Sequence, residues 1–496
     1  MSQVSFTQHG MWITELTGAG TVYHLPIPIR LNGGADRDAL AKACRGVVDR
    51  HPLLGCALED RDGVLHLVPA ACPPALRVGE GGEEAVRAEV VRPFDLERGP
   101  LIRFSLLGDT LLVVAHHVVF DGRSKDVLVA DLTALLEGES LPVPGVDAAA
   151  RHTDVAAEQR ERVESLLEEA GAFWTPRWRE PGEIVVRGGG LRSRRASAGA
   201  VVEFPCEVPD LPGLTRFEVL VAAVHALLRS YGNAGVVTAL DLSTRTPAEE
   251  DRVGCHVNEL PLFTGPSPDA LFADFAAEVR AELRRLYRFR EVPLARAVPG
   301  IKPHAALAPV SISYRRVGEK PRLGEVEWLA FNHGVRGALQ LQLADGPSGV
   351  EASLRYDPEE PVDAPGFAAD LRAVLDAVAD DPGRPLSRLI APALTDAPAT
   401  PSVSIAVSGA STPSAHSDQH DGGTGDALAV QIREIWEEVL QISPIEQDDD
   451  IFDLGGHSLT ITQIIARMRK RLGVEVPLDD FFDNPTIAGV VAVIRR

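Results

Sequence analysis

The segment TLLVVAHHVVFDG, residues 110–122, carries the strongest structural and chemical signals in the chain. Its first six residues are almost entirely apolar and follow a Gly-Asp pair, which predicts a short buried strand. Side chains alternate across a strand, so His116 and His117 point to opposite faces and cannot bind one metal ion together. One imidazole can instead project into a cleft. Its ordinary pKa lies near neutrality, which suits it to accept a proton from an amine or hydroxyl nucleophile.

Around this strand, helical and strand patterns mix without a strict βαβ rhythm, which is typical of an α+β fold. Apolar residues at helical spacing predict helices over 36–50 and over 128–136, and Thr215 with Glu218 forms a capping box for a helix that runs to about Tyr231. The glycine-rich stretch 188–195 is expected to be a surface loop. Further strands are predicted over 235–243, 310–316, 338–345 and 350–357.

Composition separates the chain into parts. Residues 392–425 are rich in Pro, Ala, Ser, Thr and Gly and lack apolar periodicity, which predicts a flexible linker. We expect two α+β lobes before it, over residues 1–175 and 176–391. After it, residues 426–496 carry repeated apolar helix faces, which predict a small helix bundle.

Charge and composition exclude several classes of protein. The formal net charge of −22, from 71 acidic and 49 basic residues, would repel a nucleic-acid backbone. No apolar run approaches the roughly 20 residues of a membrane span, and the N-terminus lacks the features of a secretion signal. The five cysteines show no CxxC spacing, so neither a disulfide framework nor a structural zinc site is expected. These features predict a cytoplasmic protein.

With these residues in view, the N-terminal region resembles a known family. HHVVFDG, residues 116–122, matches the HHxxxDG signature of the condensation domains of nonribosomal peptide synthetases, which are related in fold to chloramphenicol acetyltransferase. The resemblance covers almost all of residues 1–391 and implies two acetyltransferase-like lobes in a V, with a tunnel at their junction. Two motifs depart from the family pattern: His9 replaces an arginine, and Gly55-Cys56 replaces the usual continuation of RHPLL. Further motifs that resemble the family's are SFTQHGMW (5–12), RHPLL (50–54), RHTDVA (151–156), RVGCHVNELPL (252–262) and REVPL (290–294).

The resemblance implies roles for individual residues. His117 would face the tunnel and assist the attacking nucleophile, while His116 is expected to be packed. Asp121 would form a buried ion pair, for which Arg245 is the candidate partner. Gly122 is expected to let the chain turn beside the cleft.

Two further residues lie in the motif at 252–262. Asn258 belongs to a segment that borders the tunnel in relatives, and a tunnel-lining role and a structural role both remain open. A nucleophilic Cys255 is disfavoured, because no partner base is visible in the sequence.

The second chemical signal is DDDIFDLGGHSLT, residues 448–460. Two glycines precede Ser458, and an apolar stripe begins after it, so Ser458 is expected at a helix N-terminus, where free N–H groups favour a phosphate. With FFDNPTI (481–487) downstream, the segment resembles the peptidyl carrier domains of the same synthetases. The resemblance implies 4′-phosphopantetheine on Ser458, transferred from coenzyme A by a phosphopantetheinyl transferase.

The order of the two domains predicts a condensation–carrier didomain that joins an acyl or peptidyl thioester on an upstream carrier to an aminoacyl group on Ser458. No adenylate-forming segment lies between them, so we expect an adenylating enzyme to act in trans. Two alternatives remain open: acylation of a soluble amine or alcohol from the carrier, and a platform that only recruits a partner enzyme.

Overall fold

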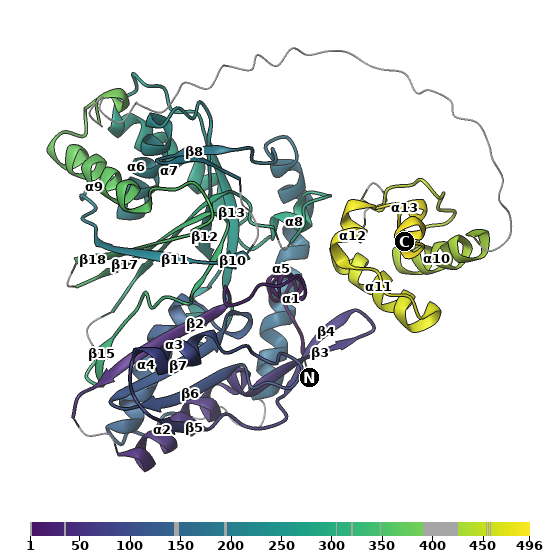
Figure 1. Ribbon diagram of the computed structural model, residues 1–496, viewed down its shortest axis with the longest axis horizontal. Helices are drawn as coiled ribbons and strands as arrows, with labels where there is room; N and C mark the ends of the chain where they lie inside the picture. Colours follow the sequence, from purple (N-terminus) through teal and green to yellow (C-terminus); the bar gives the residue numbers. More distant parts are fainter. Residues whose placement is uncertain are drawn as a thin grey trace. The chain divides into compact units, whose positions relative to one another are not determined.

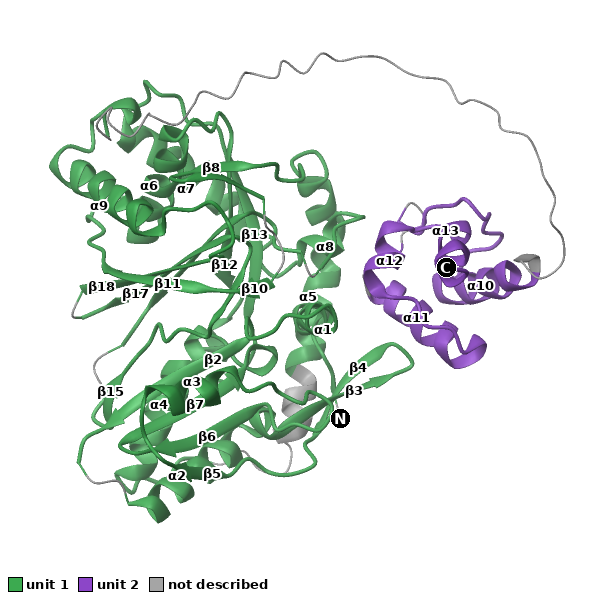
Figure 2. Cartoon of the chain, in the orientation of Figure 1, with its two compact units in different colours: residues 1–390 green, residues 391–496 purple. Residues whose placement is uncertain are grey.

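A computed structural model describes residues 2–33, 36–142, 148–192, 196–303, 305–318, 321–347, 349–389, 425–452, 454, 456 and 458–496. The chain divides into two compact units, residues 1–390 and residues 391–496 (Figure 2). Of the predicted linker, residues 392–424 lie outside the described residues, and Gly425 begins the first helix of the second unit.

The first unit contains two large sheets (Figure 1). The first is five-stranded, in the order β15-β2-β7-β6-β5, and its third strand, β7, is the predicted strand at 110–115 extended by one residue. The helix predicted over 36–50 is present as α2, whose N-cap Asp36 accepts hydrogen bonds from two backbone N–H groups. The strands are β15 (Gly324–Val326), β2 (His24–Leu31), β7 (Thr110–His116), β6 (Ile102–Leu107) and β5 (Leu76–Gly79), and the nearby helices are α1 (Phe6–Leu16), α2 (Arg37–Arg50), α3 (Glu83–Val91) and α4 (Gly122–Leu136).

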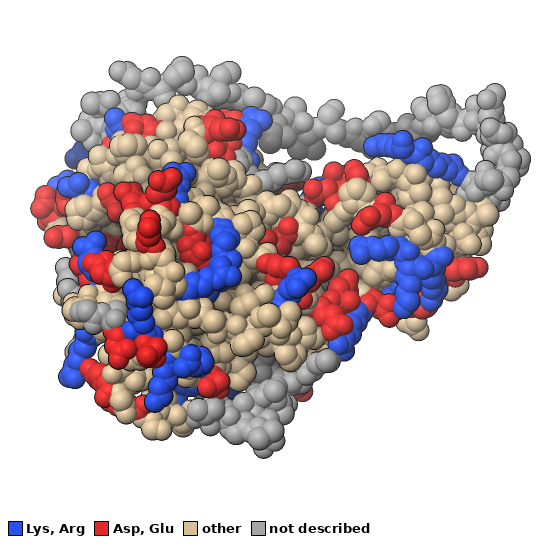
Figure 3. Space-filling view, turned by 60° about the horizontal axis from the view of Figure 1, so that its bottom comes forward, with Lys and Arg blue, Asp and Glu red and all other residues tan. Residues whose placement is uncertain are grey.

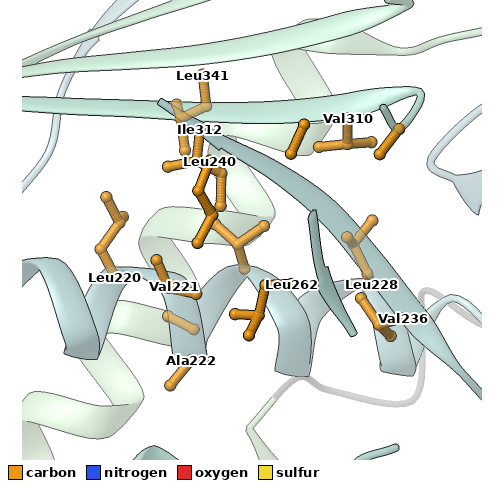
Figure 4. Packing of buried hydrophobic residues seen from close by; sticks show 14 of the residues in the cluster. Leu220, Val221, Ala222, Leu228, Val236, Leu240, Leu262, Val310, Ile312 and Leu341 are labelled. Carbon is orange, nitrogen blue, oxygen red and sulfur yellow. The ribbon is translucent and has the colours of Figure 1, made fainter. Parts of the chain in front are cut away.

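The second sheet is six-stranded, in the order β11-β18-β17-β14-β12-β13. The capping box predicted at Thr215 and Glu218 is present at the start of α6, and the four strands predicted from 235 onward are confirmed within a residue or two at their ends. One face packs on helices through Leu240, Ile312 and Leu341 (Figure 4). The strands are β11 (Ala200–Pro205), β12 (Val236–Ser243), β13 (Val257–Thr264), β14 (Val310–Arg316), β17 (Leu339–Gly346) and β18 (Gly349–Tyr356), and the helices are α6 (Arg216–Ser230), α7 (Phe272–Tyr287) and α9 (Ala364–Asp380).

Helix α5 (Ala148–Trp174) and strand β15 connect the two halves of the first unit. The long helix α5 links them in sequence, and β15, which comes from the second half of the chain, pairs antiparallel with β2 of the first sheet. A boundary at residue 175 therefore does not separate the two sheets, because one strand of the first sheet, β15, comes from beyond it. The remaining elements are β1 (Ser2–Gln3), β3 (Cys56–Arg61), β4 (Val64–Pro69), β8 (Ile184–Val186), β9 (Gly189–Leu191), β10 (Ala196–Ala198), β16 (Gly334–Arg336) and α8 (Leu294–Ala297).

The expectation of a loop over residues 188–195 is wrong in its first half. Residues 189–191 form β9, which pairs antiparallel with β8, whereas residues 193–195 lie outside the described residues. Gly188 is the residue that needs to be glycine, because its φ is +105° and a Cβ there would lie 2.7 Å from the backbone N of Asp363. The glycines thus serve a tight hairpin and a close approach of two backbones.

The second unit is helical, as predicted. Its core gathers one face of each helix around Trp436 and Phe481, whose rings stack at 5.7 Å. Because these core residues all come from positions 429–491, the unit has a hydrophobic core of its own. The helices are α10 (Gly425–Leu440), α11 (Ser458–Leu472), α12 (Leu478–Asp483) and α13 (Ile487–Ile494).

The surface is mixed in charge. Figure 3 shows acidic and basic side chains interspersed over the face that it displays. Among the described residues, no helix has both the length and the apolar character that a bilayer crossing requires.

Candidate functional site

Strand β7 places the two adjacent histidines at the end of the first sheet. His116 is its last residue, and the chain then turns into a short 3₁₀ segment, His117–Val119. The His116 side chain is 1% exposed; its Nε2 lies 3.0 Å from Glu15 Oε1, and its Nδ1 accepts a hydrogen bond from the Val118 N–H at 3.2 Å. His116 is therefore a packed residue with both nitrogens engaged, as its place in the strand predicts.

His117 has a different environment. Its side chain is half-buried, its ring meets the Tyr23 ring edge-on with centroids 6.0 Å apart, and its Nδ1 has no hydrogen-bond partner among the described residues. Burial lowers the pKa of His117, with the nearby Asp121 carboxylate opposing that shift. A neutral imidazole at pH 7 follows, which is the form that can accept a proton.

The carboxylate in the same motif pairs with an arginine. Arg245 Nη2 lies 2.8 Å from Asp121 Oδ1, and both side chains are buried, so the ion pair expected from the resemblance is present. Burial alone would raise the pKa of Asp121, but the charge and hydrogen bonds of Arg245 hold it below its ordinary value. Asp121 therefore remains ionised and engaged with Arg245, rather than serving as a proton acceptor.

This ion pair also joins segments from the two halves of the first unit. Asp121 is the N-cap of α4 and accepts hydrogen bonds from the N–H and hydroxyl of Ser124, both at 2.8 Å, while its second oxygen accepts from the His256 N–H at 3.1 Å. The Ser124 hydroxyl in turn bonds the backbone of Gly254. The start of α4 is thereby fixed to segments of the second half of the chain, which holds His117 in place five residues earlier.

The turn expected at Gly122 differs in the structure. Gly122 is the first residue of α4, and it is not among the described glycines with a positive φ. A Cβ at this position would lie 3.6 Å from Arg315 Cδ, an ordinary contact, and the Gly122 carbonyl accepts a hydrogen bond from Arg315. The glycine is thus not required by backbone conformation, because the helix cap at Asp121 makes the turn.

The other two candidates make structural contacts. Asn258 donates hydrogen bonds at 3.0 Å to the carbonyls of Arg290 and Val292, which ties β13 to the motif at 290–294. Cys255 is buried against Met11, and burial raises the pKa of its thiol to about 12, so it does not form a thiolate at neutral pH.

Sequence reasoning missed three residues beside the motif. Glu15 contacts His116, and the Tyr23 ring packs against the His117 ring. The buried amino group of Lys125 donates to the carbonyls of Pro26 at 3.1 Å and Trp328 at 3.0 Å. No local pattern marks these residues, because their partners lie far away in the sequence.

In the second unit, Ser458 is the first residue of α11. Its side chain lies outside the described residues. Gly456 precedes it in a tight turn: its N–H donates to the Ile451 carbonyl at 2.7 Å, and a Cβ there would lie 2.5 Å from Ile451 Cγ1. The first turn of a helix leaves backbone N–H groups free, so a phosphate ester on the first residue of α11 fits this position.

Comparisons with known proteins agree with both parts of this arrangement. Residues 1–304 match the model of the family described as the condensation domain. The chain belongs to the condensation-domain family. Such domains are the amide-forming acyltransferases of nonribosomal peptide synthetases. Residues 430–494 match a second model, described as a phosphopantetheine attachment site, so the condensation domain is followed by a carrier domain.

Individual relatives are large synthetases. Over 433 residues the chain is 26% identical to a linear gramicidin synthase of Brevibacillus parabrevis, covering 78% of this chain and 6% of that protein. Over 319 residues it is 27% identical to tyrocidine synthase 3 of the same organism, covering 60% of this chain and 5% of that protein. The chain therefore spans less than a tenth of each of these relatives.

Solved structures agree in fold. The first condensation domain of the CDA synthetase has a TM-score of 0.64 and 21% identity, covering 78% of this chain and 98% of that one. The X-domain in complex with OxyB from teicoplanin biosynthesis has a TM-score of 0.62 and 22% identity, covering 79% of this chain and 96% of that one. The α+β condensation fold is thus shown, with a helical carrier domain after it.

Proposed function

We propose that this chain forms an amide between an acyl or peptidyl thioester on an upstream carrier and an aminoacyl group on its own carrier domain, with Ser458 bearing the 4′-phosphopantetheine arm. The observation that carries the proposal is the half-buried His117, held beside the buried Asp121–Arg245 ion pair, in a chain that also contains an attachment site. The arm would supply a thiol that holds the aminoacyl group as a thioester.

Amide formation from a thioester needs positioning of the reactants and proton transfer from the protein. The acceptor amine attacks the thioester carbonyl, a C–N bond forms, the C–S bond breaks, and one proton leaves the nitrogen and is delivered to the departing thiolate. Holding the two reactants together supplies much of the rate. His117 accepts or orients the amine proton, while Asp121 with Arg245 acts as a positioning pair through the start of α4.

Three partner classes follow from the proposal. A phosphopantetheinyl transferase modifies Ser458, an upstream carrier delivers the donor, and an adenylating enzyme acting in trans charges the arm. A soluble amine or alcohol remains the alternative acceptor, and a platform that only recruits a partner enzyme is the non-catalytic alternative, since the X-domain found in complex with OxyB shares the fold.

The test is reconstitution followed by mass spectrometry of the Ser458 peptide. A promiscuous phosphopantetheinyl transferase loads the chain from aminoacyl-coenzyme A, and a donor acyl thioester is added. We expect the acyl-aminoacyl product on the Ser458 arm. Product on a free amine but not on the arm would favour the soluble acceptor, no product with either would favour the platform, and an unmodifiable Ser458 would overturn the carrier role.

A further inference from the structure

The six-stranded sheet carries two neighbouring rows of side chains with opposite character. The first row is apolar, and it packs against the helices on one face of the sheet (Figure 4). It consists of Leu260, Leu240, Ile312, Leu341, Leu354 and Val202, which are cross-strand partners from β13 to β11.

The residues next to these on each strand are also cross-strand partners, and they form a second row, which is polar. It consists of Glu259, Asp241, Ser313, Gln342, Ser353 and Glu203. Because side chains alternate, this row lies on the face opposite to the helices. Glu203, at the β11 end, is exposed, Ser353 is 0% exposed, and the other four members of the row are half-buried.

The β13 end of the polar row lies near the candidate active site. Glu259 forms an ion pair with Arg336 of β16. The strand β16 lies against the first lobe, since Asn332 just before it donates to the Val22 carbonyl at 3.0 Å. Burial raises the pKa of Tyr23; the charge of Arg336 opposes that rise, and the charge of Glu259 adds to it. The Tyr23 ring is the one that meets the His117 ring edge-on.

Asp241 is a half-buried carboxylate of this row with no ion pair of its own among the described residues. Arg336 is engaged by Glu259 and by the Ala305 carbonyl, and no ion pair to Asp241 is present among the described residues. The Ser313 hydroxyl is its hydrogen-bonding neighbour, and burial with the adjacent Glu259 charge raises the pKa of Asp241 to about 7, against the opposing Arg336. Asp241 thus lies near a guanidinium that is already paired with another carboxylate, in a partly buried place.

A second observation concerns two buried serines on this face of the sheet. The hydroxyl oxygens of Ser311 and Ser353 are buried without a hydrogen-bond partner among the described residues. Ser311 lies two residues before Ser313 on β14, the strand beside Asp241, so it lies on the same face close to Asp241, whereas Ser353 lies on this face three strands away, on β18. Buried hydroxyls are ordinarily satisfied, which makes this face one where a ligand can supply the donors.

From this geometry we infer that Asp241, with Glu259 and Ser311, binds a cationic group on the substrate's side chain, an ammonium or a guanidinium. This inference rests on the proposed function and names a substrate class for it. The cation can belong to the acceptor on Ser458 or to the donor, and the two arms of the test separate these sources.

The test uses the full chain and a matched pair of substrates, lysyl and norleucyl, which differ in the terminal cation. In the acceptor arm each is loaded on Ser458 from its coenzyme A thioester, and in the donor arm each is offered as the Nα-acetyl pantetheine thioester. Asp241→Asn removes the charge at nearly constant size. Glu203→Gln, the exposed carboxylate at the far end of the same row, is the matched control.

We expect the lysyl substrate to be preferred at least tenfold in one arm, and Asp241→Asn to abolish that preference while leaving the norleucyl rate and the Glu203→Gln variant unchanged. No preference in either arm, or a preference that survives Asp241→Asn, would overturn the inference.

A binding measurement separates this inference from the proposed function. Calorimetry with lysine and norleucine pantetheine amides needs no turnover. If no amide product forms in either arm but the lysine amide binds at least tenfold more tightly, and Asp241→Asn removes the difference, the binding site stands and the proposed reaction fails. Equal binding of the two amides without any product would overturn the inference as well.

Discussion

At the scale of single residues, His117 and His116 are adjacent in sequence and opposite in surroundings. We expect His117→Ala to lower the rate of amide formation by about 10²–10⁴-fold, the range for loss of one acid–base group. Thermal unfolding should change little, because the His117 side chain is half-buried and its Nδ1 has no partner among the described residues. Single-turnover assays on loaded carrier, beside a melting curve, measure both effects.

His116→Ala is the matched control for that substitution. The His116 ring is buried and bonds both Glu15 and the Val118 N–H, so its removal should lower the unfolding temperature. A His117→Ala protein with undiminished turnover would remove His117 from the reaction.

Asp121→Asn tests the buried ion pair. It leaves the Arg245 guanidinium buried without its counter-charge, which costs about 3–5 kcal/mol of folding free energy in comparable pairs. The pKa of Asp121 is lowered in the folded state, so the pair stabilises the fold fully above the ordinary carboxyl pKa of about 4 and loses that effect as pH falls through the folded pKa. Urea unfolding of both proteins from pH 7 downward measures the difference.

The stability difference between the wild type and Asp121→Asn should therefore be largest near neutrality and shrink below pH about 4. Asp210→Asn is the control, because Asp210 pairs with Arg216 at the exposed surface and should have little effect at any pH. A constant difference across the whole range would contradict the assignment.

At the scale of elements, the turn before α11 depends on Gly456. A Cβ at this position would lie 2.5 Å from Ile451 Cγ1 and 2.6 Å from the Ile451 carbonyl oxygen, so the turn must shift to admit it. We expect Gly456→Ala to destabilise the carrier domain by about 1–3 kcal/mol, as overpacking does, and to slow phosphopantetheine transfer. Mass spectrometry of the modified fraction over time measures the transfer.

Val430→Ala is the control for Gly456→Ala, since the Val430 side chain is 41% exposed on α10 of the same domain. Equal modification rates in the two variants would show that the turn tolerates a side chain.

At the scale of the whole molecule, the second unit should fold by itself, whereas the first half of the first unit should not. The core of the second unit draws only on residues 429–491, so a fragment of residues 425–496 should fold and accept phosphopantetheine by itself. A fragment of residues 1–175 should not fold stably, because it lacks β15 and Arg245. Circular dichroism and thermal melting of the two fragments test this contrast, and cooperative unfolding of the first lobe alone would contradict it.

The sequence by itself determined the features that depend on neighbours within a few residues. Strand β7, helix α2 and the capping box at Thr215 follow from local apolar periodicity and capping chemistry, and the two family signatures are likewise continuous segments. The predicted position of Ser458 at a helix start has the same origin, because a helix start is a local signal, whereas its predicted role came from the family resemblance.

Only the tertiary structure decided which distant groups meet. Asp121 and Arg245 lie 124 positions apart, and the sequence offered that pair only through the family resemblance. The polar row through Asp241 likewise had no local signal, because it runs across strands far apart in the sequence. The hairpin that includes residues 189–191 and the Asp121 cap of α4, by contrast, are made by residues within a few positions of each other, and a sequence can signal them. The distant groups meet because strand register and burial arise from contacts between segments far apart in the chain, and these contacts set the charge and exposure of each side chain.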